Sequence, residues 1–79
     1  NVTNGERFST YLIAAEAGSK TVSINGAAAH KVSPNDIIII CSYGLFKEEE
    51  AQEHQPVLVY FDDNNNVKSI KNAIPEQKL

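Results

Sequence analysis

Residues able to bind and protonate a small acid occur at alternate positions in one short stretch. Arg7, Ser9 and Tyr11 lie in a run of β-branched and aromatic residues that ends at Ile13. A guanidinium is the best planar fork for a carboxylate, and a phenol can transfer a proton. Alternate residues of a strand share a face, so Arg7 and Tyr11 face one side and Thr10 the other. Half-polar strands are ordinary in antiparallel sheets, so this stretch alone indicates an edge strand.

A second stretch has room for a ligand. Asn25-Gly26 follows a short apolar run and is followed by three alanines, residues 27–29. Small side chains let a ligand approach the backbone, whose N–H groups can bind an anion or a carbonyl oxygen. Asn-Gly also precedes the first stretch, at Asn4-Gly5, where it predicts a tight turn.

Other catalytic patterns are missing from the sequence. His30, Cys41 and His54 are isolated, so no zinc-binding spacing exists and we expect no metal. We expect the two histidines to be surface or capping residues and Cys41 to lie in the core. The sequence has no glycine-rich phosphate loop and no local motif of a serine nucleophile. The chemistry of individual residues therefore does not identify an enzyme.

The elements that must position these residues are mostly strands. Glu48 to Glu50 fit the first turn of a helix, where carboxylates complement the dipole. Gly18-Ser19 lies between strand-like runs and predicts a turn. Composition and periodicity favour an all-β fold, either a small barrel or a sandwich. The sequence predicts strands over residues 6–15, 20–24, 37–43, 57–61 and 67–70, a turn or one helical turn over 25–29, a helix over 46–54 and a polar turn over 62–66.

Bulk properties narrow the class further. A chain of 79 residues is one domain at most. Such a chain buries only about 60% of its unfolded surface, which favours association with other chains. The net charge of −3 and the scattered basic residues argue against nucleic acid as a partner. The longest apolar run, Ile37 to Cys41, is too short to span a membrane, and a single cysteine fits a reducing, cytoplasmic setting.

Two motifs in tandem carry a family resemblance. Residues 4–11, Asn-Gly-Glu-Arg-Phe-Ser-Thr-Tyr, and residues 25–30, Asn-Gly-Ala-Ala-Ala-His, resemble the pyruvoyl-dependent aspartate 1-decarboxylases of bacteria. The resemblance continues through residues 36–40 and 73–75 and covers essentially the whole chain. It implies an all-β fold of the small double-psi β-barrel type, with one or two short helices, assembled as a homotetramer. Residues 1–79 would form a single barrel domain.

The resemblance also implies a reaction. The family removes CO₂ from L-aspartate to give β-alanine for pantothenate and coenzyme A synthesis, through a Schiff base with a pyruvoyl group. That group arises from a serine in an N-terminal segment, where the chain cuts itself and releases a short N-terminal chain. We find no match for that segment and expect residues 1–79 alone to be inactive. The alternative is a non-catalytic β-barrel module that binds a peptide or protein through an exposed strand edge.

Residue roles follow from the same resemblance. Arg7 is similar to the binder of the substrate carboxylate, and Tyr11 to the proton donor. Thr10 resembles the threonine that polarises a carbonyl during self-cleavage, and Asn25 an asparagine of cleavage and substrate placement. The remaining substrate contacts that the resemblance implies are Gly26, Ala27, Ala28 and Ile39. In a regular strand Thr10 and Tyr11 point apart, so either a bulge re-aims one or they serve different subunit partners. Arg7 and Tyr11 would lie about 13 Å apart along such a strand.

Overall fold

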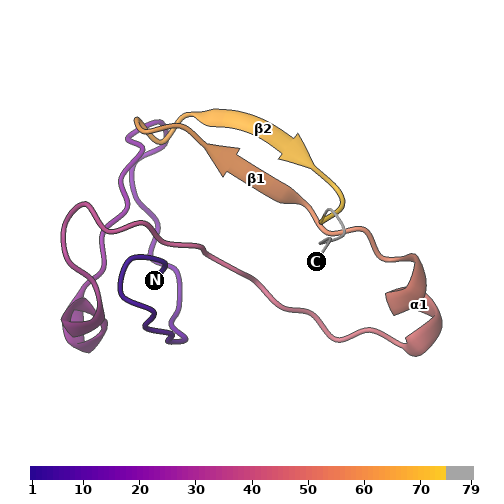
Figure 1. Ribbon diagram of the computed structural model, residues 1–79. Helices are drawn as coiled ribbons and strands as arrows, with labels where there is room; N and C mark the ends of the chain where they lie inside the picture. The colour runs from indigo at the N-terminus through magenta and orange to yellow at the C-terminus, as the bar shows by residue number, and fades with distance from the viewer. Residues whose placement is uncertain (75–79) are drawn as a thin grey trace, which may run out of the picture. The chain divides into compact units, whose positions relative to one another are not determined.

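A computed structural model of the chain describes residues 1–74, which belong to two compact units, Asn1–Tyr43 and Gly44–Leu79 (Figure 1). The expected fraying tail from Pro75 lies outside the described residues. The regular elements are η1, a 3-10 helix at Gly26–Lys31, α1 at Glu48–Glu53, β1 at Leu58–Phe61 and β2 at Val67–Lys71. Regular structure in the described part therefore consists of one two-stranded sheet and two short helices.

The sheet of the second unit is an antiparallel hairpin, which confirms the strands predicted over 57–61 and 67–70. Leu58 pairs with Lys71 and Tyr60 with Ser69, and the register shifts between Tyr60 and Phe61. The Lys71 ammonium lies 5.4 Å from the centre of the Tyr60 ring, on the neighbouring strand. Diagonal pairs of this kind are within reach of long side chains, and a cation over an aromatic face is stabilising.

The connection between the strands is held by one carboxylate. Asp62 Oδ1 accepts hydrogen bonds from the backbone N–H groups of Asn64 and Asn66, both at 2.9 Å. The Asp62 N–H donates to the Asn66 carbonyl at 2.9 Å, and Asn65 has a φ of 59°. Asparagine tolerates this left-handed conformation better than most residues. The predicted polar turn over 62–66 is thus confirmed. The Asp62 carboxylate serves as the acceptor for backbone N–H groups of the turn.

Helix α1 lies inside the predicted range and begins with three glutamates. Its N-cap, Lys47, makes no side-chain cap bond, so the carboxylates of the first turn provide the charge that favours the helix start. Phe46 and His54 flank the helix, with ring centres 4.4 Å apart. No helix among residues 1–74 has the length and apolar character needed to cross a bilayer.

In the first unit the predicted turns form. Gly18 has a φ of 81° and the Ser19 N–H donates to the Glu16 carbonyl at 3.1 Å, so Gly18-Ser19 lies in a turn as predicted. The alternative of a helical turn after Asn25 is confirmed as η1, although the helix extends to Lys31. Gly26 opens it with a φ of 67°, a conformation that glycine adopts without cost.

Three predicted strands are not formed. Segments 6–15, 20–24 and 37–43 are drawn in Figure 1 as plain trace and carry no strand ladder within the described residues. A strand needs a hydrogen-bonded neighbour, and local β propensity does not supply one. The expectation of a doubly covered central strand at 37–43 is therefore wrong for this chain.

Side-chain burial also differs from the prediction of a buried core. No described residue is fully buried. Ile37, Ile39 and Ile40 are 66%, 72% and 69% exposed, and Cys41, expected in a core, is exposed. Monomeric proteins rarely expose apolar side chains to this extent, so this part of the surface is a candidate for contact with a ligand or with other protein.

Candidate functional site

An open hollow of about 1400 Å³ occupies the first unit. Its walls are the extended segments on either side of the Gly18 turn, the start of η1 and the isoleucine-rich segment that follows residue 37. The sequence-predicted site residues that line it are Arg7, Thr10, Tyr11, Asn25, Gly26 and Ile39. Ala27 and Ala28 lie in η1 and do not line it.

Thr10 and Tyr11 both line this hollow, although a regular strand would point them apart. Their segment is extended but not paired as a strand, so the strict alternation of faces is not imposed. The Tyr11 side chain is 77% exposed. Among the described residues, no carboxylate forms an ion pair with the Arg7 guanidinium. Arg7 is therefore open to an anion from solution.

The position of the hollow's walls depends on Asn1. Its amide nitrogen donates to the Lys31 carbonyl at 3.0 Å and to Asp36 Oδ2 at 2.9 Å. Its amide oxygen accepts from the backbone N–H groups of Thr3 at 3.0 Å and Asn4 at 3.4 Å. An asparagine side chain offers two donors and two acceptor positions, so all four are used.

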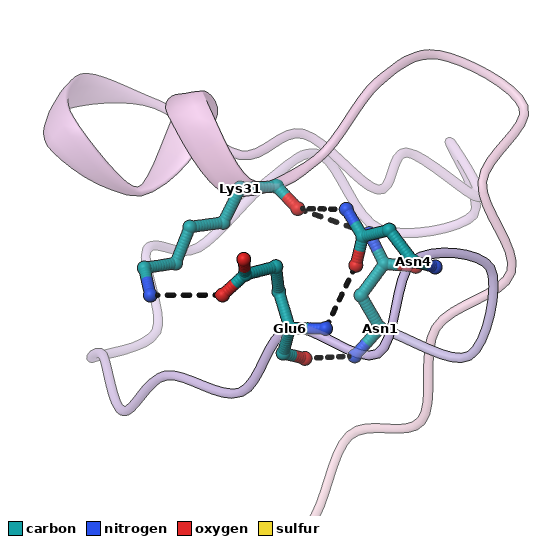
Figure 2. Close-up of polar contacts among 4 residues, drawn as sticks. All are labelled: Asn1, Asn4, Glu6 and Lys31. Carbon is teal, nitrogen blue, oxygen red and sulfur yellow. Dashed lines mark hydrogen bonds and ion pairs between the residues drawn. The ribbon is translucent and has the colours of Figure 1, made fainter.

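Asn4 adds a second link between the same segments (Figure 2). Its amide nitrogen donates to the Lys31 carbonyl at 2.9 Å, and its amide oxygen accepts from the Glu6 N–H at 2.8 Å. The Lys31 ammonium and the Glu6 carboxylate are 3.2 Å apart and about half exposed. An exposed ion pair contributes only about 0–1 kcal/mol, so the amide hydrogen bonds are the stronger part of this contact.

A third link reaches the isoleucine-rich segment. The Ile37 N–H donates to Thr3 Oγ1 at 2.8 Å, and the Val2 N–H donates to the Ile37 carbonyl at 2.8 Å. We call the side chains of Asn1, Thr3, Asn4, Glu6, Lys31 and Asp36 the asparagine clasp. The clasp joins the chain just before Arg7, the end of η1 and the start of the segment that carries Ile39.

Hydrogen bonds fix the charge of one member of the clasp. The amide of Asn1, and then the backbone N–H of Ser33 at 2.9 Å, stabilise the Asp36 carboxylate and lower its pKa below the ordinary value. A depressed pKa in the folded state means that the carboxylate stabilises the fold above its unfolded pKa. That contribution is lost as the pH falls through the folded pKa.

Sequence reasoning missed the clasp. Asn4 was predicted to lie in a tight turn, and no contact with a distant segment was predicted for Asn1, Asn4 or Asp36. The sequence signal for the clasp is its asparagine and aspartate residues, because their side chains favour hydrogen bonds to backbone groups.

No three histidine, cysteine or acidic side chains converge among the described residues as the ligands of a metal ion would.

Comparison with known proteins decides the family. The sequence profile described as aspartate decarboxylase matches residues 1–68. The chain belongs to the aspartate decarboxylase family. The family resemblance inferred from the two motifs is thus confirmed. No described feature favours the alternative of a non-catalytic module.

Curated relatives agree over nearly the whole chain. The aspartate 1-decarboxylase of Cellvibrio japonicus is 57% identical over 77 residues, which are 98% of this chain and 61% of the relative. Those of Hydrogenovibrio crunogenus and Thioalkalivibrio sulfidiphilus are 49% and 53% identical over the same share of this chain. The chain spans 60–61% of the length of these relatives.

The clasp predicts opposite pH responses for the wild type and Asn1→Asp. The substitution places a second carboxylate against Asp36, so the Thr3 and Ile37 amides should exchange hydrogen about tenfold faster near neutral pH. Mild acid should slow exchange in the variant, because protonation relieves the repulsion. Acid should lower the protection of these amides in the wild type, measured against the intrinsic exchange rate at each pH, because Asp36 loses its charge. Hydrogen exchange of the full-length protein, read by mass spectrometry, measures both.

Asn72→Asp is the matched control for this experiment. The Asn72 amide is exposed and donates to Gln55 Oε1 at 3.2 Å in the second unit. The control should leave the Thr3 and Ile37 amides unchanged. Equal exchange in Asn1→Asp and Asn72→Asp would show that the clasp does not hold these segments.

Proposed function

We propose that this chain is the larger part of an aspartate 1-decarboxylase that converts L-aspartate to β-alanine and CO₂. The observation that carries the proposal is the 57% identity to the Cellvibrio japonicus enzyme across 98% of the chain. The product would enter pantothenate and coenzyme A synthesis, in the cytoplasm. A hollow that collects a guanidinium, hydroxyls and an amide supports the same reaction.

The chemistry of the residues fits the pyruvoyl group that the family uses. A ketone next to a carbonyl needs hydrogen-bond donors and a nearby site for the substrate's carboxylate. Thr10, Tyr11 and Asn25 line the hollow as donors, and Arg7 lines it as the cation. When bound, the pyruvoyl group would supply an electron sink for the charge left by CO₂. It would derive from a serine outside residues 1–79.

Each residue of the hollow has a proposed task. Arg7 binds a substrate carboxylate through its planar fork and leaves the other carboxylate at the reacting carbon. Tyr11 delivers a proton to that carbon after CO₂ departs. Thr10 and Asn25 donate hydrogen bonds to a carbonyl oxygen during chain cleavage and substrate placement. Ile39 forms an apolar wall, and the backbone of Gly26 contacts the substrate. The substrate contacts of Ala27 and Ala28, which do not line the hollow, rest on the family resemblance alone.

The hollow is larger than aspartate requires. Pockets for drug-sized ligands occupy about 300–1000 Å³, and aspartate is smaller than most such ligands. Exposed isoleucines, and segments 6–15, 20–24 and 37–43 that carry no strand ladder, line or flank this unfilled volume. Buried backbone groups must be paired, so strands from other chains are the fitting occupants.

We therefore propose that residues 1–79 belong to one double-psi β-barrel domain. The short N-terminal chain released by self-cleavage and further copies in a homotetramer would cover its apolar segments. The lack of helix or strand pairing in segments 6–15, 21–24 and 37–43 supports this, because such backbone is available to enter a sheet.

Intact mass spectrometry and product analysis of the purified full-length protein test the function. We expect two chains, the longer one with a pyruvoyl terminus, and conversion of aspartate to β-alanine. A protein that stays in one piece and forms no β-alanine would contradict the proposal. Residues 1–79 purified alone should be inactive.

Arg7→Ala should weaken aspartate binding and leave chain cleavage intact. Loss of a desolvated charged partner costs about 2–5 kcal/mol, which should appear mainly in KM. Arg7→Lys should recover part of the loss, because an ammonium lacks the fork. Lys68→Ala, which removes an exposed cation from β2, serves as control. Steady-state kinetics unchanged in Arg7→Ala would remove Arg7 from the site.

Tyr11→Phe should separate protonation from maturation. Phenylalanine keeps the ring but removes the hydroxyl, so mass spectrometry should still show a cleaved chain with its pyruvoyl terminus. β-Alanine formation should fall by about 10²–10⁴, the usual contribution of a positioned acid. Tyr60→Phe, on β1, should retain activity. Normal turnover in Tyr11→Phe would exclude the phenol, and an uncleaved chain would assign Tyr11 to maturation instead.

A further inference from the structure

Two Asn-Gly dipeptides in the first unit have the same covalent chemistry but different surroundings. In each, the glycine nitrogen can attack the asparagine Cγ, because no side chain on the glycine shields the approach. A Cβ built at either Gly5 or Gly26 would meet no atom within 4 Å. The surroundings of the two glycines are therefore equally open, and the two sites differ in their hydrogen bonds.

Asn4-Gly5 is held in an unreactive arrangement. Both ends of the Asn4 amide are bonded, to the Lys31 carbonyl at 2.9 Å and to the Glu6 N–H at 2.8 Å. The attacking nitrogen is also engaged, since the Gly5 N–H donates to the Asn1 carbonyl at 2.9 Å. Ring closure at this site has to break the hydrogen bonds of the leaving Asn4 amide nitrogen and of the attacking Gly5 nitrogen, two bonds that Asn25-Gly26 lacks in the part of the chain that the structure describes.

Asn25-Gly26 has none of these restraints. Asn25 is exposed, and its side chain makes no cap bond to η1. Gly26 is the first residue of that helix, so its N–H has no acceptor one turn earlier. Within the described residues the Asn25 amide makes one hydrogen bond, from the Ser23 hydroxyl to Oδ1 at 3.0 Å. A donor on that oxygen draws electron density from Cγ and favours attack there.

We propose that Asn25 is a site of spontaneous deamidation, whereas the asparagine clasp protects Asn4. The Gly26 nitrogen forms a bond to Cγ of Asn25, the Cγ–Nδ2 bond breaks, and ammonia leaves with the proton from the Gly26 nitrogen. Water then adds to either carbonyl of the cyclic imide and opens it. The products are aspartate, or isoaspartate with the backbone routed through the side chain.

The product differs from asparagine in charge. The formal net charge of residues 1–79 changes from −3 to −4, by the one carboxylate that replaces an amide. This carboxylate lies on the wall of the hollow that also contains Arg7. If the proposed function holds, it would repel an acidic substrate and compete for the guanidinium.

The test is peptide mapping by mass spectrometry of the full-length protein during incubation at mildly alkaline pH. In the folded protein Asn25 should lose its amide at least about tenfold faster than Asn4, because hydrogen bonds hold both the leaving nitrogen of Asn4 and the attacking nitrogen of Gly5. In urea the two sites should react at similar rates. The readout is mass and does not depend on enzymatic activity, so it stands or fails separately from the proposed function.

Ser23→Ala should slow the reaction at Asn25, and Ser23→Thr should restore it because the hydroxyl returns. Ser69→Ala on β2 is the matched control and should have no effect. Equal rates at both sites in the folded protein, or a faster rate at Asn4, would overturn the proposal. An unchanged rate in Ser23→Ala would overturn the activating role of the hydroxyl.

Discussion

The main constraint on this chain is a shortage of internal partners. It has too few neighbouring strands and apolar side chains to pair and cover its own strand-like segments. Segments 6–15, 20–24 and 37–43 carry no strand ladder within the described residues, and no described residue is fully buried. Unpaired amides can remain in water, but the isoleucines at 37–40 gain most when other protein covers them. The same segments line the hollow, so the exposed apolar side chains and the candidate site share one surface.

Local signals in the sequence were sufficient where the partner is close along the chain. The hairpin of β1 and β2, the glutamate-rich start of α1 and the turn at Gly18-Ser19 all form as predicted. Their hydrogen bonds span only a few residues or a short loop. The strands predicted at 6–15, 20–24 and 37–43 did not form, because β propensity describes a fit to neighbours that this chain does not contain.

The candidate site shows the same division. Arg7, Tyr11 and Asn25 were selected by residue chemistry and by a family resemblance, and they line one hollow. The clasp was not predictable, because Asn1 bonds Lys31 and Asp36, which lie 30 and 35 positions further along the sequence. Turn chemistry predicts that asparagine and aspartate bond to backbone groups, but it does not say which distant ones.

The clasp also closes a long loop. The Asn4 side-chain amide donates a hydrogen bond to the Lys31 carbonyl, so the residues between them form a loop whose two ends are held together. The far end of that loop is the exposed turn at Gly18-Ser19. The entropic cost of closing a loop rises slowly with the number of residues in it, by about 0.6 kcal/mol for each doubling of loop length. Exposed turns of this kind tolerate insertions. A peptide tag or a second domain could therefore be inserted at the Gly18 turn without disturbing the hydrogen bond between Asn4 and Lys31.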